Sequence, residues 1–224
     1  MTFSIAARCA WTGRVGVAVA SSSPAVAARC AYARAGIGAA LTQNVTDPRL
    51  GPRALDLLAL GASAEDAVRI LRTSASHAEH RQVAVIDATG RVAGFSGMKC
   101  LGVHALGEAD NAIAAGNLLA NPDVPSAMLA AYAATAGADL GDRIVRAMRA
   151  GLAAGGEAGP VHSAGLLLVD NVPWPVADLR ADWHDDPIGE LERLWTLWQP
   201  QLDAYVKRAL MPDAAPAYGV PGNL

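Results

Sequence analysis

The first residues of the chain predict a β-hairpin, and this pattern restricts the fold more than any other. Residues 2–8 alternate polar and apolar side chains as a half-buried strand does, and residues 15–22 are strand-like again. Only a short turn containing Gly13 separates the two runs, which is typical of antiparallel pairing. The chain therefore does not begin with the β-α-β alternation that builds a parallel sheet.

Groups of strands and groups of helices follow one another along the rest of the sequence. Further strands are expected at 36–44, 82–97 (a second hairpin), 111–121, 163–170 and 176–182. Helices are expected at 52–60, 67–72 after a Ser63–Asp66 capping box, 126–135, 140–152 and 188–210, the last broken or kinked at Pro200. This segregation predicts an α+β fold with two mainly antiparallel sheets between helical layers.

Composition limits the class of protein. Hydrophobic residues make up 52% of the 224 residues and charged residues 17%, as in a compact globular protein. We expect one domain over residues 1–210 and an extended Pro/Ala-rich tail at 211–224. A net charge of −3 without basic runs argues against partners such as nucleic acid or a membrane. With no transmembrane-length apolar run and no signal-peptide pattern, a cytoplasmic location is expected.

Cysteine and histidine give no sign of a metal site or a cofactor. Cys9, Cys30 and Cys100 lie far apart without a CxxC pair, which indicates buried thiols. His77 and His80 share a spacing compatible with one helix face, but no carboxylate–histidine cluster completes a metal set. We therefore expect neither a metal nor an organic cofactor.

Thr2 is the candidate catalytic residue because of its place in the chain. If Met1 is removed, Thr2 carries both a nucleophilic hydroxyl and the α-amine of the chain. An α-amine has an ordinary pKa of about 7.7, so part of it is an unprotonated base at neutral pH. Nucleophile and base on one residue form the threonine/amino-terminus pair of acyl-transfer enzymes.

Several motifs resemble a family catalogued as domain of unknown function 1028. They include TFSIAAR, GVAVASSSPAV, HRQVAVIDATGRVAGFSGMKC, AGNLLAN and ADLRADWHDDPIGELERL, and together they span residue 2 to about residue 198. That family in turn resembles the N-terminal nucleophile (Ntn) hydrolases. The resemblance implies a four-layer αββα sandwich of Ntn-hydrolase type, in agreement with the layers inferred above.

The resemblance also implies site residues. Thr2 is the nucleophile, and Asn117, in the Gly116-Asn117 turn, is the first choice for a donor to the oxyanion of the transition state. The alternative is that Asn117 only supplies a left-handed turn conformation. This sequence departs from the family at Tyr32, Ala115 and Glu157, where histidine, glutamine and aspartate are common. These departures indicate a divergent substrate or a loss of activity.

Substrate-binding candidates are polar residues on the neighbouring strands and three arginines. Ser21 and Ser22 end the strand next to Thr2, and Thr42 and Gln43 end another; each pair has a structural alternative, a turn or a hydrogen-bonded core. An arginine can bind a substrate carboxylate through two parallel hydrogen bonds, or it can pair with a local acid. The arginines in question are Arg34, Arg49 and Arg53.

The leading functional hypothesis is an Ntn amidohydrolase that cleaves a small amide or related acyl compound. One alternative is a non-catalytic Ntn-fold protein for binding or scaffolding, which a retained Met1 would favour. The other is a hydrolase with an internal Ser or Cys nucleophile, which requires a nearby histidine: His104, His162 or His184. A homodimer is expected, and the stripe of Trp195 and Trp198 would mark its interface if that stripe is exposed.

Overall fold

The computed structural model describes residues 1–223. Its amino-terminal hairpin forms as expected: β1 (Thr2–Arg8) pairs antiparallel with β2 (Val15–Ser21). This hairpin lies at the centre of one sheet, whose strand order is β10-β9-β2-β1-β8-β7. The remaining strands of this first sheet are β7 (Ala105–Ala109), β8 (Ala112–Asn117), β9 (Ser163–Val169) and β10 (Pro175–Ala181).

The second sheet is also antiparallel and has the order β3-β4-β5-β6. Its strands are β3 (Ala31–Arg34), β4 (Gly38–Asn44), β5 (Arg81–Asp87) and β6 (Val92–Ser96). A single helical turn, α1 (Ala27–Cys30), leads into it from the first sheet. One edge of the molecule therefore carries both β6 and β7, the last strands of their sheets.

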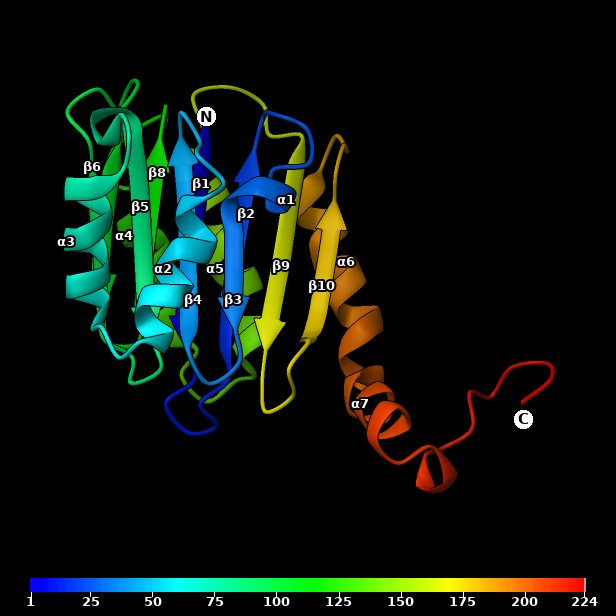
Figure 1. The fold of residues 1–224 in the computed structure, drawn as a ribbon. Coiled ribbons are helices and arrows are strands. Elements are labelled where there is room, and N and C mark those ends of the chain that lie inside the picture. The colour runs from blue at the N-terminus through cyan, green and yellow to red at the C-terminus, as the bar shows by residue number, and fades with distance from the viewer. Residues whose placement is uncertain (224) are drawn as a thin grey trace.

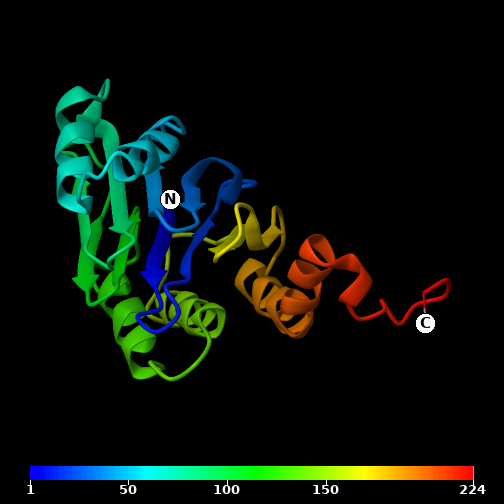
Figure 2. The same cartoon turned by 60° about the horizontal axis from the view of Figure 1, so that its bottom comes forward.

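Helices cover the outer faces of both sheets, which gives the layers α, β, β and α (Figures 1 and 2). Helices α2 (Leu50–Ala59) and α3 (Ala64–Ser74) pack on the second sheet. The first sheet is covered by α4 (Val124–Ala134), α5 (Leu140–Ala153) and α6 (Pro187–Trp198). The α+β fold and its layered αββα sandwich are thus confirmed.

Three apolar clusters separate the four layers. One lies between α4, α5, α6 and the first sheet, a second between the two sheets, and a third between the second sheet and α2 with α3. The cluster between the sheets consists almost entirely of Ala, Val, Ile and Leu side chains, with a single cysteine. Small side chains there allow the sheets to pack closely.

Capping side chains mark the starts of α3 and α6. Ser63 accepts a hydrogen bond from the Asp66 amide at the start of α3, and Asp186 accepts one from Gly189 at the start of α6. At Pro200 the helix changes to a 3-10 turn, Gln199–Gln201, and continues as α7 (Leu202–Leu210). The break at Pro200 is therefore confirmed.

Two features differ from the sequence-based expectation. The short edge strands β3 and β7 were not expected. Asn117 was expected in a turn, yet it is the last residue of β8, and the left-handed residue is Leu118 (φ 51°). The interpretation of Asn117 as a left-handed turn residue is therefore wrong, because its backbone is extended and pairs with Thr2.

The carboxyl-terminal segment 211–223 lies apart from the sandwich beyond α7 (Figure 2). It contains a 3-10 turn, Pro212–Ala214, and the Arg208 guanidinium lies over the Tyr218 ring, 4.0 Å from its centroid. None of the helices formed by residues 1–223 is long and apolar enough to cross a membrane.

Candidate active site

Strand alternation brings polar side chains together between the two sheets at one end. Four strands contribute side chains to the apolar cluster between the sheets: Ala6, Val19, Leu41 and Ala84. Residues two positions away on the same strands face the same space, because side chains alternate between the two faces of a sheet. Several polar residues with this parity, most of them buried, lie at the end marked N in Figure 1. We call this set the polar end: Thr2, Ser4, Ser21, Gln43, Gln82, Ser96 and Asn117.

Gln82 is the centre of a hydrogen-bond network in the polar end. Its Nε2 donates to the carbonyl oxygens of Gly116 (3.0 Å) and Ala105 (3.2 Å) and to Ser96 Oγ (2.9 Å). Because those carbonyls only accept, the orientation of the Gln82 amide is fixed, and its Oε1 must accept hydrogen bonds on its other side.

The orientation of Gln82 determines those of its neighbours. Gln43 Nε2 donates to Gln82 Oε1 at 2.7 Å, and Asn117 Nδ2 donates to the same oxygen at 3.1 Å. Gln43 Oε1 in turn accepts from Ser4 Oγ at 2.6 Å. Asn117 Oδ1 is then left as a buried acceptor without a partner among residues 1–223, although Asn117 is fully buried. A buried acceptor without a hydrogen bond lowers the stability of the folded protein unless a donor reaches it.

Thr2 lies at the start of β1, between Ser21 on one side and Asn117 on the other. It pairs in register with Asn117, and only 5% of the residue is exposed. The Met1 carbonyl oxygen accepts hydrogen bonds from Thr2 Oγ1 and from Ser21 Oγ, the latter at 2.6 Å. The Ser21 hydroxyl therefore points at a carbonyl oxygen directly beside the Thr2 hydroxyl.

Glu157 supplies a buried carboxyl group near the terminal amine. Its residue is 4% exposed, and both carboxylate oxygens accept a hydrogen bond from the Ser22 amide at 3.1 Å. Burial raises the pKa of Glu157 to about 7, although the positive charge of the terminal amine and the Ser22 hydrogen bond act to lower it. A carboxyl group with this pKa exchanges protons at neutral pH.

The other residues expected near Thr2 are only partly brought together. Gln43 belongs to the polar end, and Ser22 contributes its backbone amide to Glu157. Thr42 has the opposite parity and turns toward the layer of α2, where its hydroxyl donates to the Asp47 carbonyl oxygen. The strand position of Thr42 therefore separates it from Thr2.

Each of the three arginines has a local partner. Arg34 is at the opposite end of β3 and β4 and forms an ion pair with Asp56. Arg49 binds Asp47 through two hydrogen bonds, at 2.9 and 2.8 Å, and Arg53 donates to Ser74 on the outer surface. Within residues 1–223, none of these guanidinium groups hydrogen-bonds a residue of the polar end.

The three histidines considered for an internal nucleophile lie beside other groups. His104 Nδ1 lies 3.1 Å from the Gly102 carbonyl oxygen, and His184 Nδ1 accepts from the Asp186 amide. His162 stacks on Trp183 with 4.4 Å between ring centroids, and its Nδ1 has no partner among residues 1–223. Over that part of the chain no histidine hydrogen-bonds a Ser or Cys side chain, and no three His, Cys, Asp or Glu side chains are grouped to hold a metal.

Several residues of the site were not found from the sequence. Glu157 lies in a loop after α5 and reaches the site through tertiary structure, so no local pattern marks it. Ser4, Gln82 and Ser96 sit at positions where strand alternation places them on the buried face of a sheet. A polar side chain in such a place is the signal that identifies them.

The fold and the site together define a layered αββα protein with a buried polar end around the second residue. The chain belongs to the family described as "Family of unknown function (DUF1028)", whose model matches residues 2–191. The resemblance to family 1028 seen in the sequence motifs is thereby confirmed.

Solved structures show the same relationship. The chain is similar to the crystal structure of protein SPO2555 from Silicibacter pomeroyi, with 30% identity, a TM-score of 0.81 and coverage of 88% of each chain. The name of that crystal structure gives the same family, DUF1028. Anbu (ancestral beta-subunit) from Yersinia bercovieri also matches, with 11% identity and a TM-score of 0.40 over 91% of this chain and 97% of that one, which is too low for any argument. Among curated proteins, none matches this chain.

Proposed function

We propose that this protein is an N-terminal-nucleophile amidohydrolase that cleaves a small amide or related acyl compound after Met1 has been removed. The observation that carries the proposal is the position of the Thr2 hydroxyl. It is buried at the start of a central strand, beside the hydroxyl donor Ser21, and the buried carboxyl group of Glu157 accepts from the amide of Ser22, the next residue. Loss of Met1 would place the α-amine of Thr2 in the same site.

In this mechanism the α-amine of Thr2 takes the hydroxyl proton while Oγ1 attacks the acyl carbon. The negative charge that develops on the acyl oxygen is stabilised by hydrogen-bond donors. Ser21 Oγ, which already donates to a carbonyl oxygen beside Thr2, and the second Nδ2 hydrogen of Asn117 are the available ones. The α-ammonium then returns its proton to the leaving amine, and an acyl ester on Thr2 remains.

Water completes the cycle by attacking the ester in the same way, which releases the acid and regenerates Thr2. Glu157 holds the α-amine in position and exchanges protons with it, because the pKa of Glu157 is about 7. Asn117 Oδ1, which has no donor within residues 1–223 while Met1 is present, is available to accept from the freed amine.

The test uses native protein without an amino-terminal tag and a panel of small amides. We expect intact mass measurement to show that Met1 is absent, and amine release to depend on the Thr2 hydroxyl. Thr2→Ala keeps a small second residue and a free α-amine but lacks the hydroxyl, so hydrolysis should fall by about 10² or more. Thr2→Ser should keep part of the activity.

Two results would contradict the proposal. One is full retention of Met1 in the native protein, because the amine would then be displaced from the Thr2 hydroxyl. That outcome would favour the non-catalytic alternative, a protein that binds a small molecule at the polar end. The other is a Thr2→Ala variant that is as active as the native protein, since an internal nucleophile would then be responsible.

A further inference from the structure

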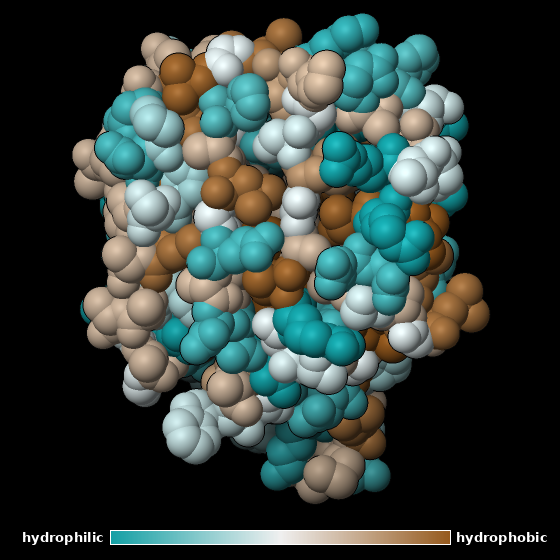
Figure 3. All heavy atoms as spheres, turned by 90° about the vertical axis from the view of Figure 1, so that its left-hand side faces the viewer, coloured by the Kyte–Doolittle hydropathy of each residue, from teal (hydrophilic) through white to brown (hydrophobic). Residues whose placement is uncertain are grey.

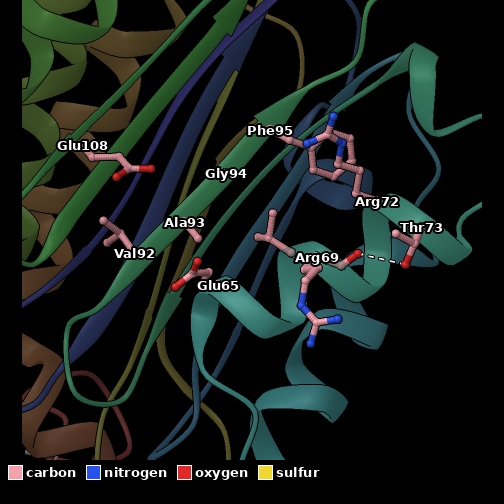
Figure 4. A pocket seen from close by; sticks show the side chains of 10 residues that line it. Glu65, Arg69, Arg72, Thr73, Val92, Ala93, Gly94, Phe95 and Glu108 are labelled. Atoms are coloured by element: carbon pink, nitrogen blue, oxygen red, sulfur yellow. Dashed lines mark hydrogen bonds between the residues drawn. The ribbon is translucent and has the colours of Figure 1, made fainter.

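A cavity of about 720 Å³ opens on the edge of the molecule where both sheets end (Figures 3 and 4). Residues Val92 to Phe95 of β6 line it consecutively, together with the exposed face of α3 and Glu108 of β7. Successive side chains of a strand point to opposite faces, so four consecutive residues line one space only if that space lies along the edge of the strand. The cavity therefore follows the open edge of β6.

This edge lacks the usual protection against strand addition. β6 pairs with β5 on one side, and among residues 1–223 no strand hydrogen-bonds to its other side. It carries neither lysine nor proline, and its central residue is Gly94. Natural proteins usually guard an exposed edge with such residues, with a bulge or with a covering segment.

Charged side chains stand at the two ends of the groove without local partners. α3 runs in the same direction as β6, since the Ala64 amide lies near Asp87 while Arg72 lies near Phe95 and Ser96. Glu65 is thus at the Val92 end and Arg72 at the Phe95 end, as Figure 4 shows. Among residues 1–223, neither Glu65 nor Arg72 has a hydrogen-bonding side-chain partner or an ion pair.

The groove is apolar between these charges. Val68 and Phe95 are buried there, and Arg69 is neutralised by its ion pair with Asp66 at 2.9 Å. Figure 3 shows hydrophobic side chains interspersed with hydrophilic ones on this face. Such an arrangement has an apolar middle, a cation at one end and an anion at the other.

We infer that this edge is the interface with a second copy of the chain, in which β6 pairs antiparallel with β6 of the partner about a two-fold axis through Gly94. A two-fold axis reverses the direction of the partner's strand and helix. The Arg72 end of each copy then meets the Glu65 end of the other, so the charge pattern is self-complementary. The spacing agrees: seven helical residues span about 10 Å, as do the three steps from Val92 to Phe95 along a strand.

The axis also explains the residues at the centre. Val68 and Arg69 of one copy of α3 would contact Val68 and Arg69 of the second copy. The aliphatic part of the Arg69 side chain would cover apolar surface there. At Gly94 a Cβ atom would point toward Leu106 of the first sheet, so the residue on the axis places nothing between the two paired strands. The interface joins the two second sheets into one continuous sheet and removes both open edges.

Sedimentation equilibrium of the native chain, with a charge-swap series, tests this interface. We expect a dimer that Arg72→Glu or Glu65→Arg each weakens by roughly tenfold or more, because each variant creates two like-charge contacts by symmetry. The double variant Glu65→Arg/Arg72→Glu restores opposite charges and should dimerise within about threefold of the native protein. Arg193→Glu on α6 changes the net charge equally, and it should have no effect because Arg193 pairs with Glu190 away from this edge.

Amide hydrogen exchange gives a second readout at the same residues. Exchange of the outward amides of residues 92–96 should slow as protein concentration rises through the dimerisation range, and Arg72→Glu should abolish that dependence. A native chain that remains monomeric at about 100 µM would overturn the proposal. The open edge of β6 would then be a binding site for a strand of another protein. A dimer that is indifferent to the charge swaps would overturn it as well. Neither result depends on hydrolysis, so failure here is distinct from failure of the proposed function.

Discussion

The Gln82 side chain shows how one residue holds the polar end in place. It joins β5 to the carbonyl oxygens of the first sheet and fixes the orientations of Gln43 and Asn117. Gln82→Leu removes these hydrogen bonds and leaves buried donors and acceptors unpaired, which we expect to lower the free energy of unfolding by about 2–4 kcal/mol.

Urea unfolding checks this prediction, with Ser96→Ala as the matched control. Ser96 accepts a single hydrogen bond from the same nitrogen at a partly exposed position, so its loss should cost less than about 1.5 kcal/mol. Equal losses for the two variants would mean that the network does not stabilise the site in the way described.

Glu157 gives the protein a specific pH dependence of stability. Its pKa rises from an ordinary value of 4.5 to about 7 on folding, so the folded state binds the proton more tightly. The native protein therefore loses stability as the pH rises from about 4.5 to 7, by at most roughly 3 kcal/mol. Glu157→Gln has no such proton to lose, and its stability relative to the native protein should increase over this range.

Chemical denaturation at several pH values between 4 and 8 measures that difference. A difference between Glu157→Gln and the native protein that stays constant with pH would show that Glu157 is not buried in the way described. Such a result would also remove its proposed role beside the α-amine.

Different signals in the sequence led to the candidate site residues. Thr2 was proposed because it directly follows Met1, and Asn117 because the motif containing it resembles the family. Arg34, Arg49 and Arg53 were chosen by charge alone, and the tertiary structure places each beside a local partner. Side-chain type does not reveal which end of a strand a residue occupies in the folded protein.

At the scale of elements, strands and helices were predictable where alternation or capping was strong. β3 and β7 were missed because short edge strands carry little pattern, and β3 is only four residues long. Trp195 and Trp198 have helical spacing, but the stripe they form is not an exposed one: Trp195 is buried and donates to Asp142, while Trp198 donates to the Val176 carbonyl oxygen. The spacing predicted the helix and could not show which face of it is covered.

Packing of α5 against β2 provides a test at this scale. A Cβ atom on Gly16 would lie 2.4 Å from Leu168 Cδ2 and 2.8 Å from Ile144 Cδ1, both of which are in the core. We therefore expect Gly16→Ala to lower the free energy of unfolding by about 1–3 kcal/mol. Gly137→Ala is the control: no heavy atom lies within 4 Å of its Cβ position, and the substitution should be neutral or slightly stabilising. Equal effects of the two substitutions would contradict the close approach of α5 to β2.

At the scale of the whole molecule, the order of elements was enough to predict the layers. Hairpins required antiparallel sheets, and grouped helices had to cover their outer faces. What the order could not give is the stacking of the two sheets, which brings Ser4 of β1 to Gln43 of β4. The polar end exists only because of this stacking, and for that reason most of its residues were not predicted.

If Thr2 is the nucleophile, an activated ester should acylate its hydroxyl, and the acylated residue can be located. Native protein is incubated with p-nitrophenyl acetate, and the acetylated residue is located by tandem mass spectrometry, with Thr2→Ala as the control that retains the α-amine. We expect a chain without Met1 that is acetylated on Thr2 at least about 10² times faster than the Thr2→Ala variant is acetylated. An unmodified Thr2, or equal acetylation of the Ala variant, would contradict it.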